Sequence, residues 1–296
     1  MKISPLLKKF VFFTYLVSFS LVLIFLASDA VFSFTEKFGR SMVLLGSVYM
    51  FVPLGVSFIL LRNRGKTLRE YGARFNFSPS WTLVFLLQPL IMVLTVIVSM
   101  ASGAGTFDPE YSGFMEKMRE QMNEENFEKV KNQLEKAGPF LMFIQAFLMG
   151  ITINAVFAFG EEMGWRGLMF KELENEKFIR KSVFIGAVWG VWHFPLILMG
   201  HNFPEHNIVG VPVMIISCIL LSVFITFARE KTGSVFAAAV FHGLFNALAG
   251  YPIILIKGAE NIVKNPLGIS GIAAMIIMAV PLLLYMKNNG NSVRKL

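Results

Sequence analysis

The sequence contains little charge and almost no cysteine. Only 16% of its 296 residues are Asp, Glu, Lys or Arg, whereas 55% are hydrophobic and the mean hydropathy is +0.63. A water-soluble domain cannot bury so much apolar surface, which excludes a soluble enzyme and a disordered scaffold. The single cysteine, Cys218, has no partner for an intrachain disulfide, which excludes a disulfide-stapled secreted protein. The composition therefore indicates a protein that lies in a lipid bilayer.

Long apolar runs recur from one end of the sequence to the other. A helix needs about 20 mostly apolar residues to cross the hydrocarbon core of a bilayer. Charged and Gly/Pro-rich breaks divide the chain into eight such segments, at about 10–34, 41–61, 81–101, 139–160, 182–200, 208–228, 234–256 and 267–286. We therefore expect an all-α, polytopic membrane helix bundle of about eight transmembrane helices, forming a single integral-membrane domain over 1–296.

The basic residues are distributed unevenly between the two sides of this bundle. Eight spans place both termini on one side, and 18 of the 27 Lys and Arg fall in segments on that side. Because Lys and Arg concentrate in the cytoplasmic loops of membrane proteins, we expect both termini to be cytoplasmic. The net charge of +8 is expected to face membrane lipid headgroups, and we expect no nucleic acid partner.

The longest polar stretch lies on the other side, in the loop before the fourth segment. Its apolar residues fall near helical spacing among Glu and Lys, and Gly138-Pro139 supplies a stop. We expect one amphipathic helix over 112–137 that rests on the outer headgroups or on the bundle. A functional lid is the alternative.

Ionisable side chains are rare inside the apolar segments, and their cost there makes them candidates for function. The first group lies at the cytoplasmic end of the fourth segment, in Phe159–Gly167. On a helix Glu162 and Arg166 are four residues apart and can pair, which leaves Glu161 free to point elsewhere. Simple capping of a helix at the membrane interface is the alternative.

Two further segments each carry one histidine. In the run Trp189-Gly190-Val191-Trp192-His193, the histidine is expected near mid-membrane, where a hydrogen-bonded structural histidine is the alternative. In His242-Gly243-Leu244-Phe245-Asn246, an imidazole and an amide share one helical face and can donate hydrogen bonds to one oxygen, interhelical polar packing being the alternative. The other two histidines, His201 and His206, are expected in a solvated outer turn.

Together these groups exceed what helix packing needs, so we expect them to line one polar cavity. A carboxylate and an imidazole in a dry cavity can remove a proton from a shared water, while two donors hold the carbonyl oxygen under attack. This chemistry is amide hydrolysis within a membrane.

A zinc ion held by Glu161, His193 and His242 is the competing use of the same groups. The sequence lacks the HExxH pair that places two zinc ligands on one helical turn. We therefore favour metal-free activation of water with no cofactor, and keep zinc as the alternative. A serine mechanism is disfavoured because no GxSxG motif is present, and no GxGD aspartate motif occurs either.

In order along the chain, the three segments resemble the CPBP family, which groups type II CAAX prenyl endopeptidases with bacterial bacteriocin-processing and immunity (Abi) proteins. The family pattern is EExxxR, then FxxxH, then HxxxN or HxxxB, each on its own membrane helix. The first and third motifs are complete here, as Glu161-Glu162 with Arg166 and as His242 with Asn246. The second has Trp189 in the place of the usual phenylalanine.

The resemblance implies a glutamate-type intramembrane endopeptidase with a catalytic core at about 139–256 and a cavity open toward the cytosol. It implies that Glu161 and His193 activate water and that His242 and Asn246 hold the oxyanion. The supporting residues are then Glu162, Arg166 and Trp189. The implied substrate is a prenylated CAAX protein, from which the last three residues are removed, or another membrane-associated peptide.

Two other classes of function use the same residues. A proton-coupled transporter would employ the same intramembrane glutamate and histidines, and it would not cut an amide bond. A non-proteolytic bacteriocin-immunity protein would tolerate alanine at Glu161.

Overall fold

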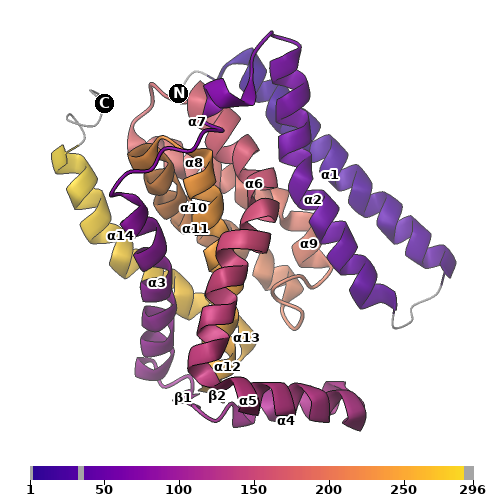
Figure 1. Ribbon diagram of the computed structural model, residues 1–296. Coiled ribbons are helices and arrows are strands. Elements are labelled where there is room, and N and C mark those ends of the chain that lie inside the picture. Colours follow the sequence, from indigo (N-terminus) through magenta and orange to yellow (C-terminus); the bar gives the residue numbers. More distant parts are fainter. Residues whose placement is uncertain (1–2, 33–36, 290–296) are drawn as a thin grey trace.

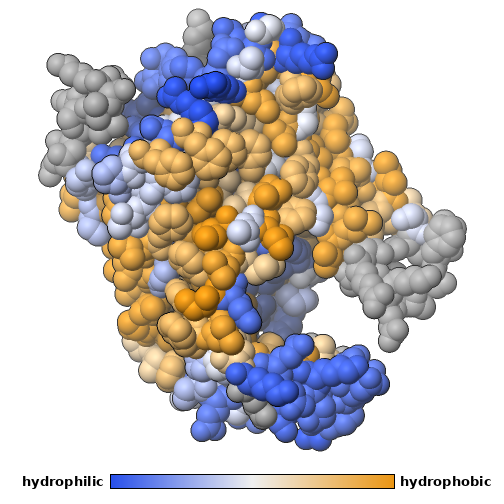
Figure 2. All heavy atoms as spheres, viewed as in Figure 1, coloured by the Kyte–Doolittle hydropathy of each residue, from blue (hydrophilic) through white to orange (hydrophobic). Residues whose placement is uncertain are grey.

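The computed structural model describes residues 3–32 and 37–289, so residues 33–34 of the first expected segment lie outside it. The described chain is almost entirely helical, with one two-stranded sheet. Seven of its helices are long and apolar enough to cross a membrane. Hydrophobic side chains cover the middle of the molecule and hydrophilic ones gather at its two ends (Figure 2). The fold is therefore the polytopic membrane helix bundle that the sequence predicts.

The long helices follow the expected apolar segments closely. They are α1 (Pro5–Phe32), α2 (Lys37–Arg62), α3 (Trp81–Ala101), α10 (Asn207–Thr232), α11 (Val235–Leu248) continued by α12 (Gly250–Leu255), and α14 (Ile269–Asn289), which follows the short α13 (Asn261–Lys264). The short helix η1 (Leu68–Tyr71) lies between α2 and α3. The start of α1 and the end of α14 lie at one end of the bundle, which we call the terminal end (Figure 1).

The fourth segment is a longer helical column than expected. It runs through α5 (Glu124–Met149), the π-helical turn η2 (Gly150–Asn154), α6 (Ala155–Glu162), the π-helical turn η3 (Met163–Met169) and α7 (Phe170–Glu172). Its apolar part spans Lys136–Glu172, 37 residues, which we call the central column. π-helical turns are rare and are found mostly at functional sites, and here η2 precedes α6 and η3 follows it.

The fifth segment is not one continuous helix. It consists of α8 (Phe178–Trp192) and α9 (Phe194–Leu198), with His193 between them. Pro195 has no backbone N–H and cannot extend the hydrogen-bond ladder of α8, which explains the break. Because of the break, neither part of this segment is long enough to count among the seven spanning helices. This segment is the eighth span that the sequence predicts.

The outer loop contains two helices where the sequence analysis expected one over 112–137. Helix α4 (Ser112–Gln121) ends before Asn123, whose side chain accepts a hydrogen bond from the Asn126 N–H at 2.9 Å and begins α5. Asn is a strong N-cap residue, so this local signal divides the amphipathic stretch. We call α4 and residues 124–137 the outer hairpin; it lies at the end of the bundle opposite the terminal end (Figure 1).

A small sheet fastens the outer hairpin to the bundle. Strand β1 (Thr106–Phe107) pairs antiparallel with β2 (Ile256–Lys257), and Lys257 also forms an ion pair with Glu116 of α4 at 2.8 Å. Next to β1, the Asp108 carboxylate accepts a hydrogen bond from the Gly113 N–H at 2.7 Å, in the first turn of α4. Burial alone would raise the pKa of Asp108, but the hydrogen bonds from Gly113 and from Ser112 outweigh it and hold that pKa below its usual value.

Asp108→Asn is expected to loosen α4 at neutral pH, because an amide oxygen accepts hydrogen bonds more weakly than a carboxylate. Since the folded-state pKa is lowered, the stabilisation is present above the unfolded pKa of about 3.9 and is lost as the pH falls through the folded pKa. The ratio of α4 amide exchange rates, variant to wild type, should be about fivefold at pH 6 and approach one at strongly acidic pH. Glu120→Gln, an exposed change on the same helix, should leave the ratio at one.

Two glycines allow the helices around the fourth segment to approach closely. A Cβ at Gly160 in α6 would lie 2.6 Å from the backbone oxygen of Met50 in α2, and one at Gly243 in α11 would lie 2.4 Å from the backbone oxygen of Gly150. Small residues serve this purpose in membrane bundles. The central column is thereby held between α2 and α11.

Candidate active site

The two adjacent glutamates end α6 in the interior of the bundle. Glu161 is 2% exposed, and Glu162 and Arg166 are fully buried. The Arg166 Nη1 group donates to both oxygens of Glu162, at 3.1 and 3.0 Å, as the four-residue spacing predicts. Glu161 takes no part in this pair, because the adjacent residue on a helix points about 100° away.

His242 of α11 contacts the same carboxylate, which the sequence spacing alone does not indicate. Its Nδ1 lies 2.9 Å from Oε1 of Glu162. A histidine held at one ring nitrogen by a carboxylate has a fixed orientation and presents its other nitrogen elsewhere. Glu162 therefore lies between Arg166 and His242 and fixes the ring of the latter.

Trp189 connects the other two expected site residues. Its indole N–H donates to Oε2 of Glu161 at 2.7 Å. Its backbone oxygen lies 2.9 Å from Nδ1 of His193, and because a carbonyl only accepts, the histidine must donate from Nδ1. In the neutral ring Nε2 then keeps its lone pair. One residue of α8 thus orients both a carboxylate on α6 and an imidazole at the helix break.

Hydrogen bonds also hold the end of α8, just before the break at His193. Tyr49 of α2 donates its hydroxyl to the Trp192 carbonyl oxygen at 2.7 Å, and the Trp192 indole N–H donates to Ser18 of α1 at 2.8 Å. These bonds tie α8 to α1 and α2. Nothing in the sequence pattern around Tyr49 or Ser18 signals them, since each is one of several polar residues scattered through an apolar run.

Glu161, His193, His242 and Asn246 line one cavity of about 360 Å³. The structure therefore brings together the four residues that the sequence analysis expected to act together. Trp189 also lines this cavity, whereas Glu162 and Arg166 lie behind it.

The cavity opens away from the terminal end of the bundle. Glu161, His193 and His242 are at most 8% exposed, whereas Asn246, one turn beyond His242 along α11, is exposed. His201, which follows α9 and was expected in a solvated turn, is also exposed and lines the same cavity. The cavity is further lined by Asn202 and the buried Asn265. The molecular surface is hollowed between the bundle and the outer hairpin (Figure 2).

The side chains that a zinc ion would use do not converge on one point in the described part of the chain. No group of three or more His, Cys, Asp or Glu side chains in residues 3–32 and 37–289 is placed to hold a metal ion. A zinc ligand lies within about 2.2 Å of the metal, which requires three donors to converge. His242 directs Nδ1 to Glu162 and Glu161 gives one oxygen to Trp189, contacts that leave Nε2 of His242 and Oε1 of Glu161 open.

Comparison with known proteins agrees with the motifs. Residues 138–248 match the family model described as type II CAAX prenyl endopeptidase Rce1-like. The chain is 22% identical over 246 residues to "CAAX prenyl protease 2" of Methanococcus maripaludis, an alignment that covers 78% of this chain and 81% of that protein. The matched segment begins near the start of the central column and ends in α11, so it contains every residue of the three motifs.

Proposed function

Because this chain belongs to the CPBP family of CAAX proteases, we propose that it is an intramembrane endopeptidase in which Glu161 and His193 activate water. The proposal rests on the two contacts of Trp189, which orient the side chains of Glu161 and His193 at the wall of one cavity. A general base needs a free lone pair within reach of the proton it removes. Glu161 keeps Oε1 for this role and His193 keeps Nε2.

In the proposed reaction, Glu161 removes a proton from a water that also donates to His193. The hydroxide oxygen attacks the carbonyl carbon of the scissile amide, and the carbonyl oxygen becomes negatively charged. The C–N bond then breaks, and the proton held by Glu161 passes to the leaving nitrogen. The products are a new carboxyl terminus and a free amine. Proton transfer by positioned groups contributes about 10²–10⁴ to such rates.

His242 and Asn246 are proposed to stabilise the negative oxygen. They lie one helical turn apart on α11 and line the cavity together. His242 is fixed through Nδ1 by Glu162, so Nε2 is the nitrogen that would donate to substrate. Removing one donor of this kind from a protease costs about 10²–10³ in rate.

We propose that the substrate is the C-terminal peptide of a prenylated CAAX protein, with another membrane-associated peptide as the alternative. The relative from Methanococcus maripaludis carries the name of a CAAX prenyl protease. The cavity volume lies within the range of ligand pockets, and the surrounding bundle is apolar, as a lipid-modified peptide requires.

Purified protein in detergent should remove three residues from a quenched-fluorescent farnesylated CAAX peptide, with and without a strong chelator. Cleavage that the chelator abolishes would overturn the metal-free mechanism and favour the zinc version. If this peptide stays intact while a peptide library is cut, the protease stands and the CAAX substrate is wrong. No cleavage of either would contradict the protease assignment and favour a transporter or immunity protein.

Trp189→Phe, which restores the residue usual in the family, is expected to lower kcat roughly 10- to 100-fold. The change removes the N–H that holds Glu161, and a hydrogen bond to a charged group contributes about 1.5–3 kcal/mol. The ring is kept, so KM and the midpoint of thermal unfolding should change little. Trp81→Phe, at a tryptophan outside the site, is the control. An unchanged kcat would show that Trp189 does not position the base.

We also propose that both termini are cytoplasmic, as the distribution of Lys and Arg indicates. The cavity mouth would then face the outer half of the membrane, opposite to the cytosolic mouth that the family resemblance implies. In intact cells, a membrane-impermeant maleimide should label His201→Cys and leave Arg64→Cys unlabelled. The native Cys218 is buried and should not react with the reagent. Labelling of Arg64→Cys alone would show that the proposed orientation is wrong and that the cavity mouth faces the cytosol.

A further inference from the structure

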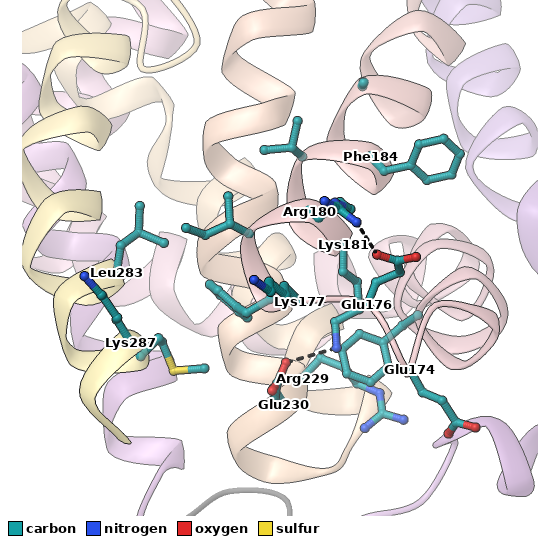
Figure 3. A pocket seen from close by; sticks show the side chains of 16 residues that line it. Glu174, Glu176, Lys177, Arg180, Lys181, Phe184, Arg229, Glu230, Leu283 and Lys287 are labelled. Atoms are coloured by element: carbon teal, nitrogen blue, oxygen red, sulfur yellow. Dashed lines mark hydrogen bonds and ion pairs between the residues drawn. The ribbon is translucent and has the colours of Figure 1, made fainter. Parts of the chain in front are cut away.

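A second and larger cavity lies at the terminal end of the bundle, separate from the candidate active site. It has a volume of about 1220 Å³ and shares no lining residue with the active-site cavity. Its walls come from the segment that joins α7 to α8, from the first half of α8, from the end of α10 and from the end of α14 (Figure 3). We call it the terminal groove.

One part of the terminal groove is apolar. It is lined by Val183, Phe184 and Ala187 of α8 and by Leu283 and Met286 of α14. Val183 is 40% exposed and the neighbouring Ile179 is 53% exposed, although both side chains are apolar. At the level of the membrane such surface is covered by hydrocarbon chains, because lipid-facing side chains are apolar and exposed only to lipid.

The other part carries more positive than negative charge. Its three acids are each paired: Glu176 with Arg180 at 3.3 Å, Glu230 with Lys181 at 3.1 Å, and Glu174 with Lys171 at 2.5 Å. The remaining cations of the groove are Lys177, Arg229 and Lys287. In the described part of the chain, none of these three has a carboxylate within 4.0 Å.

The three cations differ in how accessible they are. Arg229 is 8% exposed, donates Nε to the Arg166 carbonyl oxygen at 2.9 Å and lies over the Phe170 ring. Lys177 and Lys287 are exposed and stand on different walls, at the start of α8 and near the end of α14 (Figure 3). A ligand that met both lysines would therefore bridge the two helices above the apolar part.

We propose that the terminal groove binds an anionic phospholipid, with its phosphate at Lys177 and Lys287 and its acyl chains along α8 and α14. The site combines unpaired cations at a membrane boundary with an exposed apolar wall below them. Basic pockets between membrane helices bind anionic headgroups in this way. A soluble anion would use the lysines and leave the apolar wall without a partner.

The proposal is tested by lipid binding to the purified full-length protein in neutral detergent, followed by native mass spectrometry. Phosphatidylglycerol should bind more tightly than phosphatidylcholine with the same acyl chains. Each basic side chain near anionic lipid contributes about a factor of five, so Lys177→Gln/Lys287→Gln should weaken phosphatidylglycerol binding roughly 25-fold. Lys177→Arg/Lys287→Arg keeps the charges and should retain binding.

The matched control is Lys8→Gln/Lys9→Gln, which removes two exposed charges from the same end of the bundle. This variant should bind phosphatidylglycerol like the wild type; equal weakening would show a general charge effect and overturn the site. Equal binding of phosphatidylcholine would overturn the role of the anion. Competition by glycerol phosphate at the same concentration as the lipid would show that the apolar wall contributes nothing, and would also overturn the proposal.

Discussion

Glu161→Gln is expected to lower the rate of peptide cleavage roughly a thousandfold while leaving the fold intact. An amide has nearly the same shape as the carboxylate and still offers an oxygen to the Trp189 N–H, so the contact that now measures 2.7 Å is retained. What is lost is the ability to take a proton from water. Because Glu161 is 2% exposed, no bulk solvent base replaces it.

The measurement is cleavage of the farnesylated peptide under single-turnover conditions, which isolates the chemical step. Glu120→Gln is the matched control, an identical chemical change at an exposed position of the outer hairpin, and it should leave the rate unchanged. The thermal unfolding midpoint of Glu161→Gln should equal or exceed that of the wild type, since a buried charge is removed. A variant that keeps a tenth of wild-type activity would rule out Glu161 as the base.

Arg166→Met is expected to destabilise the protein by about 3–5 kcal/mol, the cost of leaving one partner of a buried ion pair without the other. Glu162 and Arg166 are both fully buried, and the Glu162 carboxylate would retain only the contact with His242. The double variant Glu162→Gln/Arg166→Met should recover much of this loss, because no uncompensated charge remains and because Nε and Nη2 of Arg166 have no partner in the described structure.

Denaturant unfolding in detergent, followed for the two single variants and the double variant, measures the coupling between the residues. Lys66→Met is the control, since Lys66 pairs with Glu70 at the same four-residue spacing on an exposed surface and should matter little. Destabilisation of the double variant equal to the sum of the single variants would show that the two side chains do not act as a pair.

The sequence predicts those parts of the molecule that depend on spacing along one helix. The apolar segments predict the spanning helices, and the four-residue interval predicts the contact between Glu162 and Arg166. The expectation that Glu161, His193, His242 and Asn246 line one cavity also agrees with the structure. Each of these features is set by helical periodicity or by the cost of charge in a membrane.

Contacts between helices were beyond the reach of the same reasoning. The link between His242 and Glu162 joins residues 80 positions apart, and Tyr49 reaches Trp192 across 143 positions. Nothing in a single helical face encodes such distances. Trp189 shows this most clearly: the sequence marks it only as a substitute for phenylalanine, whereas in the structure its N–H holds Glu161.

The length of the central column has a consequence for the enzyme's response to its membrane. The chain is kinked at Gly138, and from Pro139 to Glu172 the column extends about 50 Å at 1.5 Å per residue, whereas the hydrocarbon core is about 30 Å thick. Glu161 lies well inside this length, so the depth of the carboxylate depends on tilt and on hydrophobic mismatch between the column and the bilayer. A thicker bilayer would immerse Glu161 further in hydrocarbon, and a thinner one would bring it toward the headgroups and their water.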